Sequence, residues 1–156
     1  MSYGPGTGPP PRPLPDEELS DLLGRQRFGA LATQKNDGHP HLSTVSYTWD
    51  AARRVVKIST MAGRAKVRQL HKNPLCALYV ASDDFGSFAV AEGEAELSPV
   101  TTEPGDEIGL ELLAMRGLAD PVDHAAFLQQ MVTDQRLAIR LRVQRLYGTA
   151  WEIPAP

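Results

Sequence analysis

The sequence is short of several features that mark common classes of protein. It has one cysteine, Cys76, in 156 residues, which excludes an internal disulfide and fits a reducing cytoplasm. No apolar run approaches the length of a transmembrane helix, and the first residues lack the basic-then-apolar pattern of a signal peptide, so we expect a cytoplasmic protein without a membrane partner. The formal net charge of −3 is unlike that of basic nucleic-acid-binding domains, and we expect no nucleic-acid partner.

Acidic residues are absent from residues 51–82, although the chain as a whole is acidic. The basic residues of this segment are Arg53, Arg54, Lys57, Arg64, Lys66, Arg68 and Lys72. Positive charge is therefore concentrated in one segment, which indicates either a site for an anion or a solvated basic helix. The second interpretation is the usual one for a run of charge, and it stays open.

At the centre of this segment, the end of a strand, a turn of small residues and the start of a helix follow one another. Gly63 is a plausible N-cap, and Arg64 and Lys66 would then lie in the first helical turn, where cations have the wrong sign for the helix dipole. A bound anion would resolve this conflict. Backbone N–H groups, a guanidinium group and the hydroxyls of Ser59 and Thr60 together predict a phosphate site, although the pattern is neither a P-loop nor a dinucleotide fingerprint.

The remaining chain predicts one domain, residues 16–156, after a disordered tail at residues 1–15 that holds six of the 13 prolines. Helices are expected at about residues 16–24, 64–73, 107–116 and 121–131, and strands at residues 28–33, 41–49, 55–60, 75–81, 88–97 and 136–146. Hairpin connections dominate, so we expect a mainly β fold with helices (α+β). Its sheet should be mostly antiparallel and closed as a small barrel, and Gly93 marks a bulge or a close backbone approach.

Several side chains have two interpretations. The half-polar strand 41–49 is typical of a ligand groove, and its Tyr47 and Trp49 would either stack on a ring or fill the core or a dimer interface. His39 and His41 lack partners at metal-ligand spacing, so we predict no metal site. An anion or a solvent-facing strand edge explains Arg140 and Arg142 equally well, and Cys76 is expected to be buried and inert.

Several motifs between Leu19 and Gly148 resemble those of a known group of proteins. Residues 28–33 and 37–43 resemble the opening hairpin of the pyridoxamine 5'-phosphate oxidase-like, FMN-binding split β-barrel superfamily. Arg64-Ala65-Lys66, followed by Asn73-Pro74, is similar to the phosphate-binding helix of that superfamily. Residues 89–95 and 131–136 resemble, more narrowly, its deazaflavin (coenzyme F420) oxidoreductase branch.

The resemblance implies a dimeric split β-barrel with two cofactor sites at the subunit interface. Ser59, Thr60, Arg64, Ala65 and Lys66 would hold the cofactor phosphate. The ring system would lie against residues 44–46, with His41 nearby, and Phe88 and Arg136 would come from the partner chain. The complete set of expected cofactor-binding residues is His41, Thr44, Val45, Ser46, Ser59, Thr60, Met61, Arg64, Ala65, Lys66, Gln69, Phe88 and Arg136.

Two departures from the superfamily pattern concern Gly63, where a proline or an acid is frequent, and the loop 85–87, where some members have a tryptophan. The second difference leaves the shape of the substrate pocket open.

The resemblance leads us to expect an F420-dependent oxidoreductase that transfers a hydride from reduced deazaflavin to a small unsaturated acceptor. The alternatives are an FMN-dependent oxidoreductase of the same fold and a non-catalytic protein that binds or carries F420. The polyglutamate tail of F420 would suit surplus cations, and Arg53, Arg54 and Arg68 are such cations. Because the ring carries the hydride chemistry, the absence of a catalytic triad is expected, and no side chain is named as a general acid.

Overall fold

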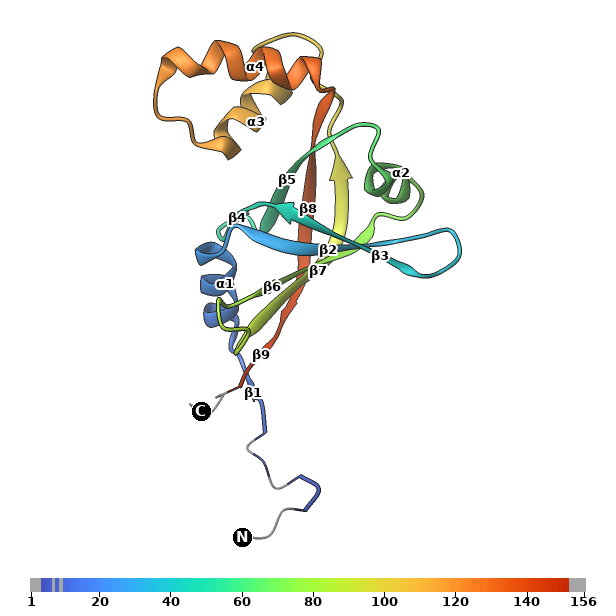
Figure 1. The fold of residues 1–156 in the computed structure, drawn as a ribbon, viewed down its shortest axis with the longest axis vertical. Helices are drawn as coiled ribbons and strands as arrows, with labels where there is room; N and C mark the ends of the chain where they lie inside the picture. The colour runs from blue at the N-terminus through green and yellow to red at the C-terminus, as the bar shows by residue number, and fades with distance from the viewer. Residues whose placement is uncertain (1–3, 7, 9, 152–156) are drawn as a thin grey trace.

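The structure is a computed structural model that describes residues 4–6, 8 and 10–151 (Figure 1). Its helices are α1 (Asp16–Arg25), α2 (Ala65–Lys72), α3 (Glu107–Arg116) and α4 (His124–Thr133), the last preceded by the 3-10 turn η1 (Pro121–Asp123). Its strands are β1 (Arg12–Pro13), β2 (Phe28–Gln34), β3 (Pro40–Ser46), β4 (Thr48–Asp50), β5 (Val55–Met61), β6 (Leu75–Ala81), β7 (Phe88–Leu97), β8 (Arg136–Tyr147) and β9 (Thr149–Ala150).

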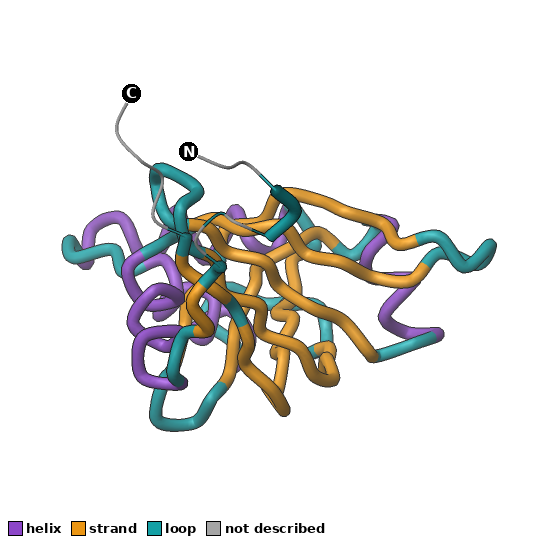
Figure 2. Tube along the Cα trace, turned by 90° about the horizontal axis from the view of Figure 1, so that it is seen from below, coloured by secondary structure: helices purple, strands orange, loops and turns teal. Residues whose placement is uncertain are grey.

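Seven strands form one antiparallel sheet in the order β3-β2-β6-β7-β8-β5-β4. β3 and β4 are consecutive in the chain but lie at opposite ends of this order, so the sheet curls on itself, as the tube in Figure 2 shows. β3 approaches β5 without a hydrogen-bonded ladder among the described residues, and the barrel is therefore split along this line. The split separates the two strands that carry most of the expected cofactor-binding residues.

The barrel interior is filled by the alternate residues of each strand that point inward. Leu31, Ile58, Leu78 and Ile139 come from four strands, and at most 1% of the surface of each is exposed. Helix α1 closes one end of the barrel with three buried leucines, Leu19, Leu22 and Leu23. The sheet thus encloses a mainly apolar core, with Thr33 and Thr60 as buried polar residues.

Helices α3 and α4 pack against each other and extend beyond one end of the barrel (Figure 1). Their small apolar cluster contains Ile108, Leu112, Met131 and the β8 residue Ala138. Asp106 caps α3 by accepting a hydrogen bond from the Gly109 amide at 2.8 Å and from the Thr101 hydroxyl at 2.6 Å. These hydrogen bonds lower the pKa of Asp106 well below its usual range.

Ion pairs also hold α3 on the sheet. Arg140 of β8 binds Glu111 of α3 with Nη2···Oε2 at 2.6 Å and binds Glu96 of β7 at 3.0 Å. These contacts raise the pKa of Arg140 and lower that of Glu111. Arg142 also pairs with Glu96. Because β8 lies between β7 and β5, one of the two interpretations of these arginines, a solvent-facing strand edge, was wrong.

Most expected elements are present within one or two residues of their predicted bounds. The bulge expected at Gly93 is confirmed, since the register of β7 against β8 shifts between Glu92 and Gly93, and a Cβ at Gly93 would meet the Arg142 carbonyl oxygen at 1.9 Å. Gly38 lies in the turn between β2 and β3 with a φ of 87°, a backbone conformation that suits glycine. The predicted helix start at Asp120 is a 3-10 turn before α4, with Asp120 accepting from the Val122 amide.

Three local expectations were wrong. The strand expected at 41–49 is broken at Tyr47, whose amide donates to the Arg27 carbonyl while its hydroxyl donates to Leu23 O at 2.6 Å. The N-cap of α2 is Arg64 and not Gly63, because Arg64 is still extended and its carbonyl accepts from the Val67 amide. Residues 12 and 13, assigned to the tail, pair with β9, and the Leu14 amide donates to the Gly148 carbonyl.

No helix among the described residues is long and apolar enough to span a membrane. Cys76 is buried, and burial raises its pKa to about 12, which makes its thiol a poor nucleophile. No group of three or more potential metal ligands occurs within the described residues.

Candidate functional site

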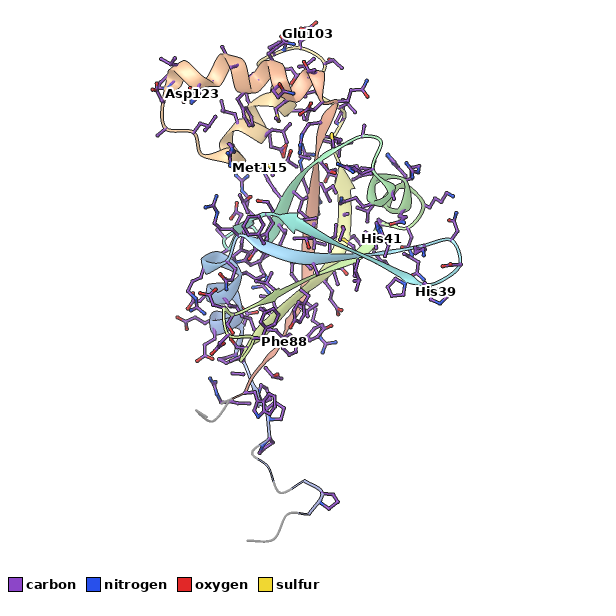
Figure 3. All side chains as sticks on the ribbon, in the orientation of Figure 1. His39, His41, Phe88, Glu103, Met115 and Asp123 are labelled. Atoms are coloured by element: carbon purple, nitrogen blue, oxygen red, sulfur yellow. The ribbon has the colours of Figure 1, made fainter. Side chains whose placement is uncertain are left out.

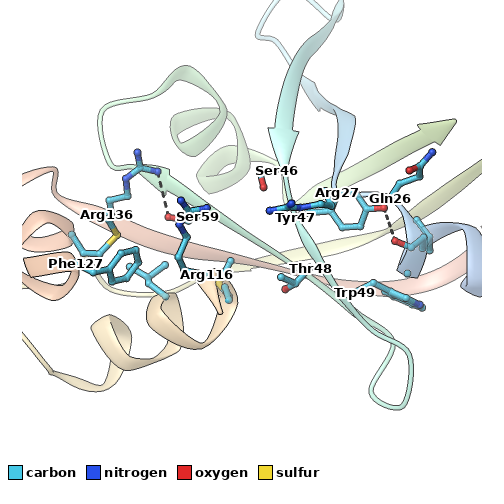
Figure 4. A pocket seen from close by; sticks show the side chains of 15 residues that line it. Gln26, Arg27, Ser46, Tyr47, Thr48, Trp49, Ser59, Arg116, Phe127 and Arg136 are labelled. Carbon is cyan, nitrogen blue, oxygen red and sulfur yellow. Dashed lines mark hydrogen bonds between the residues drawn. The ribbon is translucent and has the colours of Figure 1, made fainter. Parts of the chain in front are cut away.

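A pocket of about 600 Å³ lies between the α3–α4 pair and the barrel, next to the split (Figure 4). Its apolar residues are Leu23, Leu112, Met115, Phe127 and Met131, and Trp49 adds a ring whose Nε1 donates to Ser20 Oγ at 2.9 Å. Ser46 and Ser59 line the pocket from strands on either side of the split. The pocket thus combines an apolar wall with hydroxyl groups, as is typical of sites for small organic ligands.

Arg136 lies beside Ser59 at this pocket. Its Nη1 donates to Ser59 Oγ at 3.3 Å, shown as a dashed line in Figure 4. Its Nε is buried without a hydrogen bond, and the nearest carboxylate, Asp134, is 3.8 Å away. A buried guanidinium nitrogen without an acceptor is unfavourable in the empty protein, so this donor can be used by a ligand.

The N-terminus of α2 forms a second part of the candidate site. Arg64 is the N-cap, Ala65 the first helical residue and Lys66 the second, and no carboxylate in the described structure pairs with either cation. Burial, and to a lesser degree the charge of Arg64, lower the pKa of Lys66. Two neighbouring cations at the positive end of a helix fit an anion such as phosphate.

Gln69 connects α2 to the opening hairpin. Its Oε1 accepts from Thr33 Oγ1 at 2.6 Å and lies 2.9 Å from His41 Nδ1. Because an amide oxygen can only accept, Nδ1 carries the proton in this arrangement, and Nε2 of a neutral His41 is left as an acceptor. The structure therefore brings His41 and Gln69 together, although the sequence alone gave no sign of their contact.

Strand geometry separates other expected site residues. Val45 and Thr60 are buried on the core faces of β3 and β5, whereas Ser59 and Met61 lie on the opposite face of β5. Neighbouring residues of a strand point to opposite faces, so the hydroxyls of Ser59 and Thr60 cannot act together on one phosphate group. Only the backbone of Val45 can reach a ligand in the split.

Thr44 and Phe88 belong to the outer face of the sheet. Phe88 stacks on Tyr79, with the ring centroids 5.4 Å apart, and Thr44 lines a separate pocket of about 390 Å³ with Phe28 and Tyr79. This face exposes 63% of Phe28, 65% of Leu42 and 37% of Tyr79. A contiguous apolar surface of this kind is typical of a protein interface.

The surplus cations have different surroundings in the structure. Arg54 binds both carboxylate oxygens of Asp16 at 3.0 Å, and Arg68 donates to the Gly63 carbonyl at 2.8 Å. Of the three surplus arginines, only Arg53 has no side-chain partner within the described residues. The part of the F420 expectation that depended on Arg54 and Arg68 is therefore weakened.

Two pocket arginines were missed by sequence reasoning. Arg27, immediately before β2, and Arg116, in the last turn of α3, both line the large pocket (Figure 4). His39, in contrast, lies on the exposed hairpin (Figure 3). Each of the two arginines lies outside any recognisable motif in the sequence. Only the docking of α3–α4 beside β4 and β5 brings them to one pocket.

The family model described as pyridoxamine 5'-phosphate oxidase matches residues 15–150. The chain belongs to the pyridoxamine 5'-phosphate oxidase family. Members of this family are often oxidoreductases and commonly dimers.

Solved structures support the same fold. The chain is similar to the conserved hypothetical protein Rv2991 from Mycobacterium tuberculosis, with a TM-score of 0.70 and 21% identity over 92% of this chain and 91% of that one. It is similar to an F420 reductase, with a TM-score of 0.61 and 23% identity over 85% and 98% of the two chains. It is also similar to a FAD-binding protein (mll6688) from Mesorhizobium loti, with a TM-score of 0.64 and 24% identity over 93% of this chain and 100% of that one. These identities show the split-barrel fold, an α+β architecture, and no more.

Proposed function

We propose that this protein is an oxidoreductase that binds coenzyme F420 and transfers a hydride from the reduced deazaflavin to a small unsaturated acceptor. The observation that carries the proposal is the pair of cations at the N-terminus of α2, Arg64 and Lys66, which have no carboxylate partner in the described structure. A cofactor phosphate is the anion that would neutralise them. The F420 reductase among the structural neighbours and the sequence motifs at 89–95 and 131–136 favour deazaflavin over FMN.

The described residues fit such a cofactor on three counts. Lys66 and Arg64 offer charge-assisted contacts to phosphate, and the buried Nε of Arg136 lacks an acceptor that a ring carbonyl or a linker oxygen would supply. Ser46 and Ser59 lie on the two strands that flank the split. β3 and β5 are not hydrogen-bonded to each other there, so backbone N–H and C=O groups along the split can face a ring system. His41 presents Nε2 as an acceptor.

Hydride transfer is the chemistry that the deazaflavin ring supplies when it is bound. The chain's own residues bind and orient: Lys66 and Arg64 hold the phosphate, and Gln69 fixes the tautomer of His41. The apolar wall of Leu112, Met115 and Phe127 excludes water from the pocket.

We also propose that the protein is a homodimer. The exposed apolar residues Phe28, Leu42 and Tyr79 on the outer face of the sheet are the surface that a second copy would cover. Phe88 and Thr44 lie on the same face. In such a dimer, Phe88 and Thr44 of one chain would approach the site of the other chain. Arg136 instead already contacts Ser59 within one chain, and we assign it to the site of its own chain.

The proposal is tested by titrating the purified protein separately with F420 and FMN and following the fluorescence of each. We expect F420 to bind more tightly, and reduced F420 to be oxidised in the presence of an acceptor. Tighter binding of FMN, or a yellow protein with a flavin absorption peak, would assign the FMN-dependent activity instead. Binding of F420 without turnover of any acceptor would favour a carrier.

A further inference from the structure

The charge of the large pocket is one-sided. Three guanidinium groups line it, those of Arg27, Arg116 and Arg136, and no aspartate or glutamate is among its described lining residues. Arg136 lies 3.8 Å from the carboxylate of Asp134, whereas Arg27 and Arg116 have no acidic partner among the described residues. In a chain with a formal net charge of −3, two arginines without an acidic partner in one pocket indicate an anionic occupant.

Arg27 and Arg116 are available for such an occupant. Neither side chain makes a hydrogen bond or an ion pair with another described residue. Figure 4 shows the two side chains reaching into the pocket from different walls, Arg116 from α3 and Arg27 from the side of Tyr47 and Gln26. The position of Arg116 in the last turn of α3 suits the helix dipole, but Arg27 has no such explanation.

The apolar lining of the pocket indicates the chemistry of the uncharged part of the occupant. Met115, Phe127 and Met131 come from α3 and α4, and Trp49 faces the same space from β4. Aromatic and thioether groups pack well against flat, polarizable molecules. A guanidinium group binds carboxylate through two parallel hydrogen bonds, which makes arginine more selective than lysine for this planar anion.

We propose that the acceptor of the reaction is a planar, unsaturated carboxylate whose charged group is held by Arg27 and Arg116. This inference rests on the proposed function, because it takes the large pocket as the acceptor's half of an F420-dependent site. Arg27 and Arg116 are then specificity-determining residues, which select the acid over a neutral molecule of the same shape.

The polyglutamate tail of F420 is the other source of carboxylate groups. Its position is tied to the cofactor phosphate, which the proposed function places at Arg64 and Lys66. Neither of these residues lines the large pocket, and Arg64 follows Ser59 by five residues, beyond the end of β5. The acceptor, which must meet the ring near Ser46 and Ser59, is therefore the better match for Arg27 and Arg116.

The test uses two pairs of probes that differ in charge but not in shape: 2-naphthoate with 2-naphthamide, and cinnamate with cinnamamide. Their affinities are measured by calorimetry on the protein loaded with oxidised F420. The variants are Arg27→Gln and Arg116→Gln. The control is Arg25→Gln, an exposed arginine two residues from Arg27 that does not line the pocket. Melting temperatures establish that each variant is folded.

We expect the acids to bind at least tenfold more tightly than the amides. Each pocket variant should weaken acid binding by roughly tenfold or more, the loss of one charge-assisted contact, while amide binding and F420 affinity stay unchanged. Arg25→Gln should change neither. Equal affinities for acid and amide, no binding of either acid, or equal losses in the control would overturn the proposal.

Two further arms separate the alternatives. F420 with its glutamates and the tail-free cofactor are each titrated against Arg27→Gln. A loss confined to the glutamate-bearing form would assign the arginines to the cofactor tail and overturn the acceptor assignment. If the wild-type protein binds no F420, the proposed function fails, and the same probes on the protein without cofactor then show whether the arginines still select carboxylates. No selection there would overturn the carboxylate site as well.

Discussion

Replacing Lys66 by alanine tests the phosphate site at α2 directly. Lys66 is the second residue of that helix, is half-buried, and has no acidic partner in the described structure. If it donates one charge-assisted hydrogen bond to a cofactor phosphate, the substitution should lower the binding free energy by roughly 1.5–3 kcal/mol. At 1.4 kcal/mol per factor of ten, F420 should bind roughly ten- to a hundredfold more weakly.

The protein without cofactor should respond in the opposite direction. The pKa of Lys66 in the folded chain lies below its ordinary value of 10.5, chiefly because burial disfavours the charged form. The protonated side chain therefore destabilises the empty fold, and this penalty is present at neutral pH and disappears as the pH rises toward 10.5. We expect Lys66→Ala to have an equal or slightly higher melting temperature at neutral pH.

The assay is a fluorescence titration with F420 and with a deazaflavin that lacks the phosphate. The control is Lys72→Ala, which removes the same charge from the opposite end of α2, where Lys72 is exposed and donates a hydrogen bond to Asn36 Oδ1 at 3.3 Å. Lys66→Ala should weaken F420 alone, and Lys72→Ala should weaken neither ligand. Equal affinity of Lys66→Ala and the wild type for F420, or an equal loss for the phosphate-free ligand, would refute a phosphate contact at this lysine.

Three further substitutions test the fold and the assembly. Tyr47→Phe should lower the free energy of unfolding by about 1–2 kcal/mol in urea titrations, because the Leu23 carbonyl loses its 2.6 Å donor. Burial raises the pKa of Tyr47, so wild-type stability should fall as the pH rises above 10, and a flat alkaline profile would contradict this. Asp106→Ala should cost about 1 kcal/mol and Asp106→Asn less, since asparagine also caps helices. Because hydrogen bonds lower the pKa of Asp106, its contribution to the free energy of unfolding is present above pH 3.8, its ordinary pKa, and is lost as the pH falls below that value. Equal stability of the alanine variant and the wild type at pH 7 would contradict a stabilising cap. Tyr79→Asp should turn the proposed dimer into a monomer in sedimentation experiments, and a wild type that is itself monomeric would contradict the proposed interface.

Much of the fold follows from local pattern. Alternating apolar residues predicted β5, β6, β7 and β8, because one face of each strand fills the barrel. Gly38 and Gly93 marked a turn and a bulge, since Gly38 has a positive φ and a Cβ at Gly93 would clash with the backbone of Arg142. These positions depend on the residue and its immediate neighbours, which is why the sequence alone revealed them.

What the sequence did not reveal depends on distant contacts. Strand 41–49 breaks at Tyr47 because Arg27 and Leu23 supply hydrogen-bond partners from elsewhere in the chain. The cationic pocket needs Arg27 and Arg116, which are 89 positions apart and meet only when α3 and α4 dock beside the barrel. The α2 site could be proposed from sequence because its strand, turn and helix are contiguous.

The two parts of the candidate site are connected by β5. Ser59 lines the pocket, and two residues later the strand ends and the turn to Arg64 begins. Successive strand residues advance about 3.3 Å, so an extended ligand along β5 can reach from the pocket to the helix N-terminus over a few residues. The split makes this path accessible, because β3 and β5 form no ladder there. A ligand with a flat ring at one end and a phosphate at the other fits this path. The side of the pocket lined by Arg27 and Arg116 is then available to a second, anionic molecule.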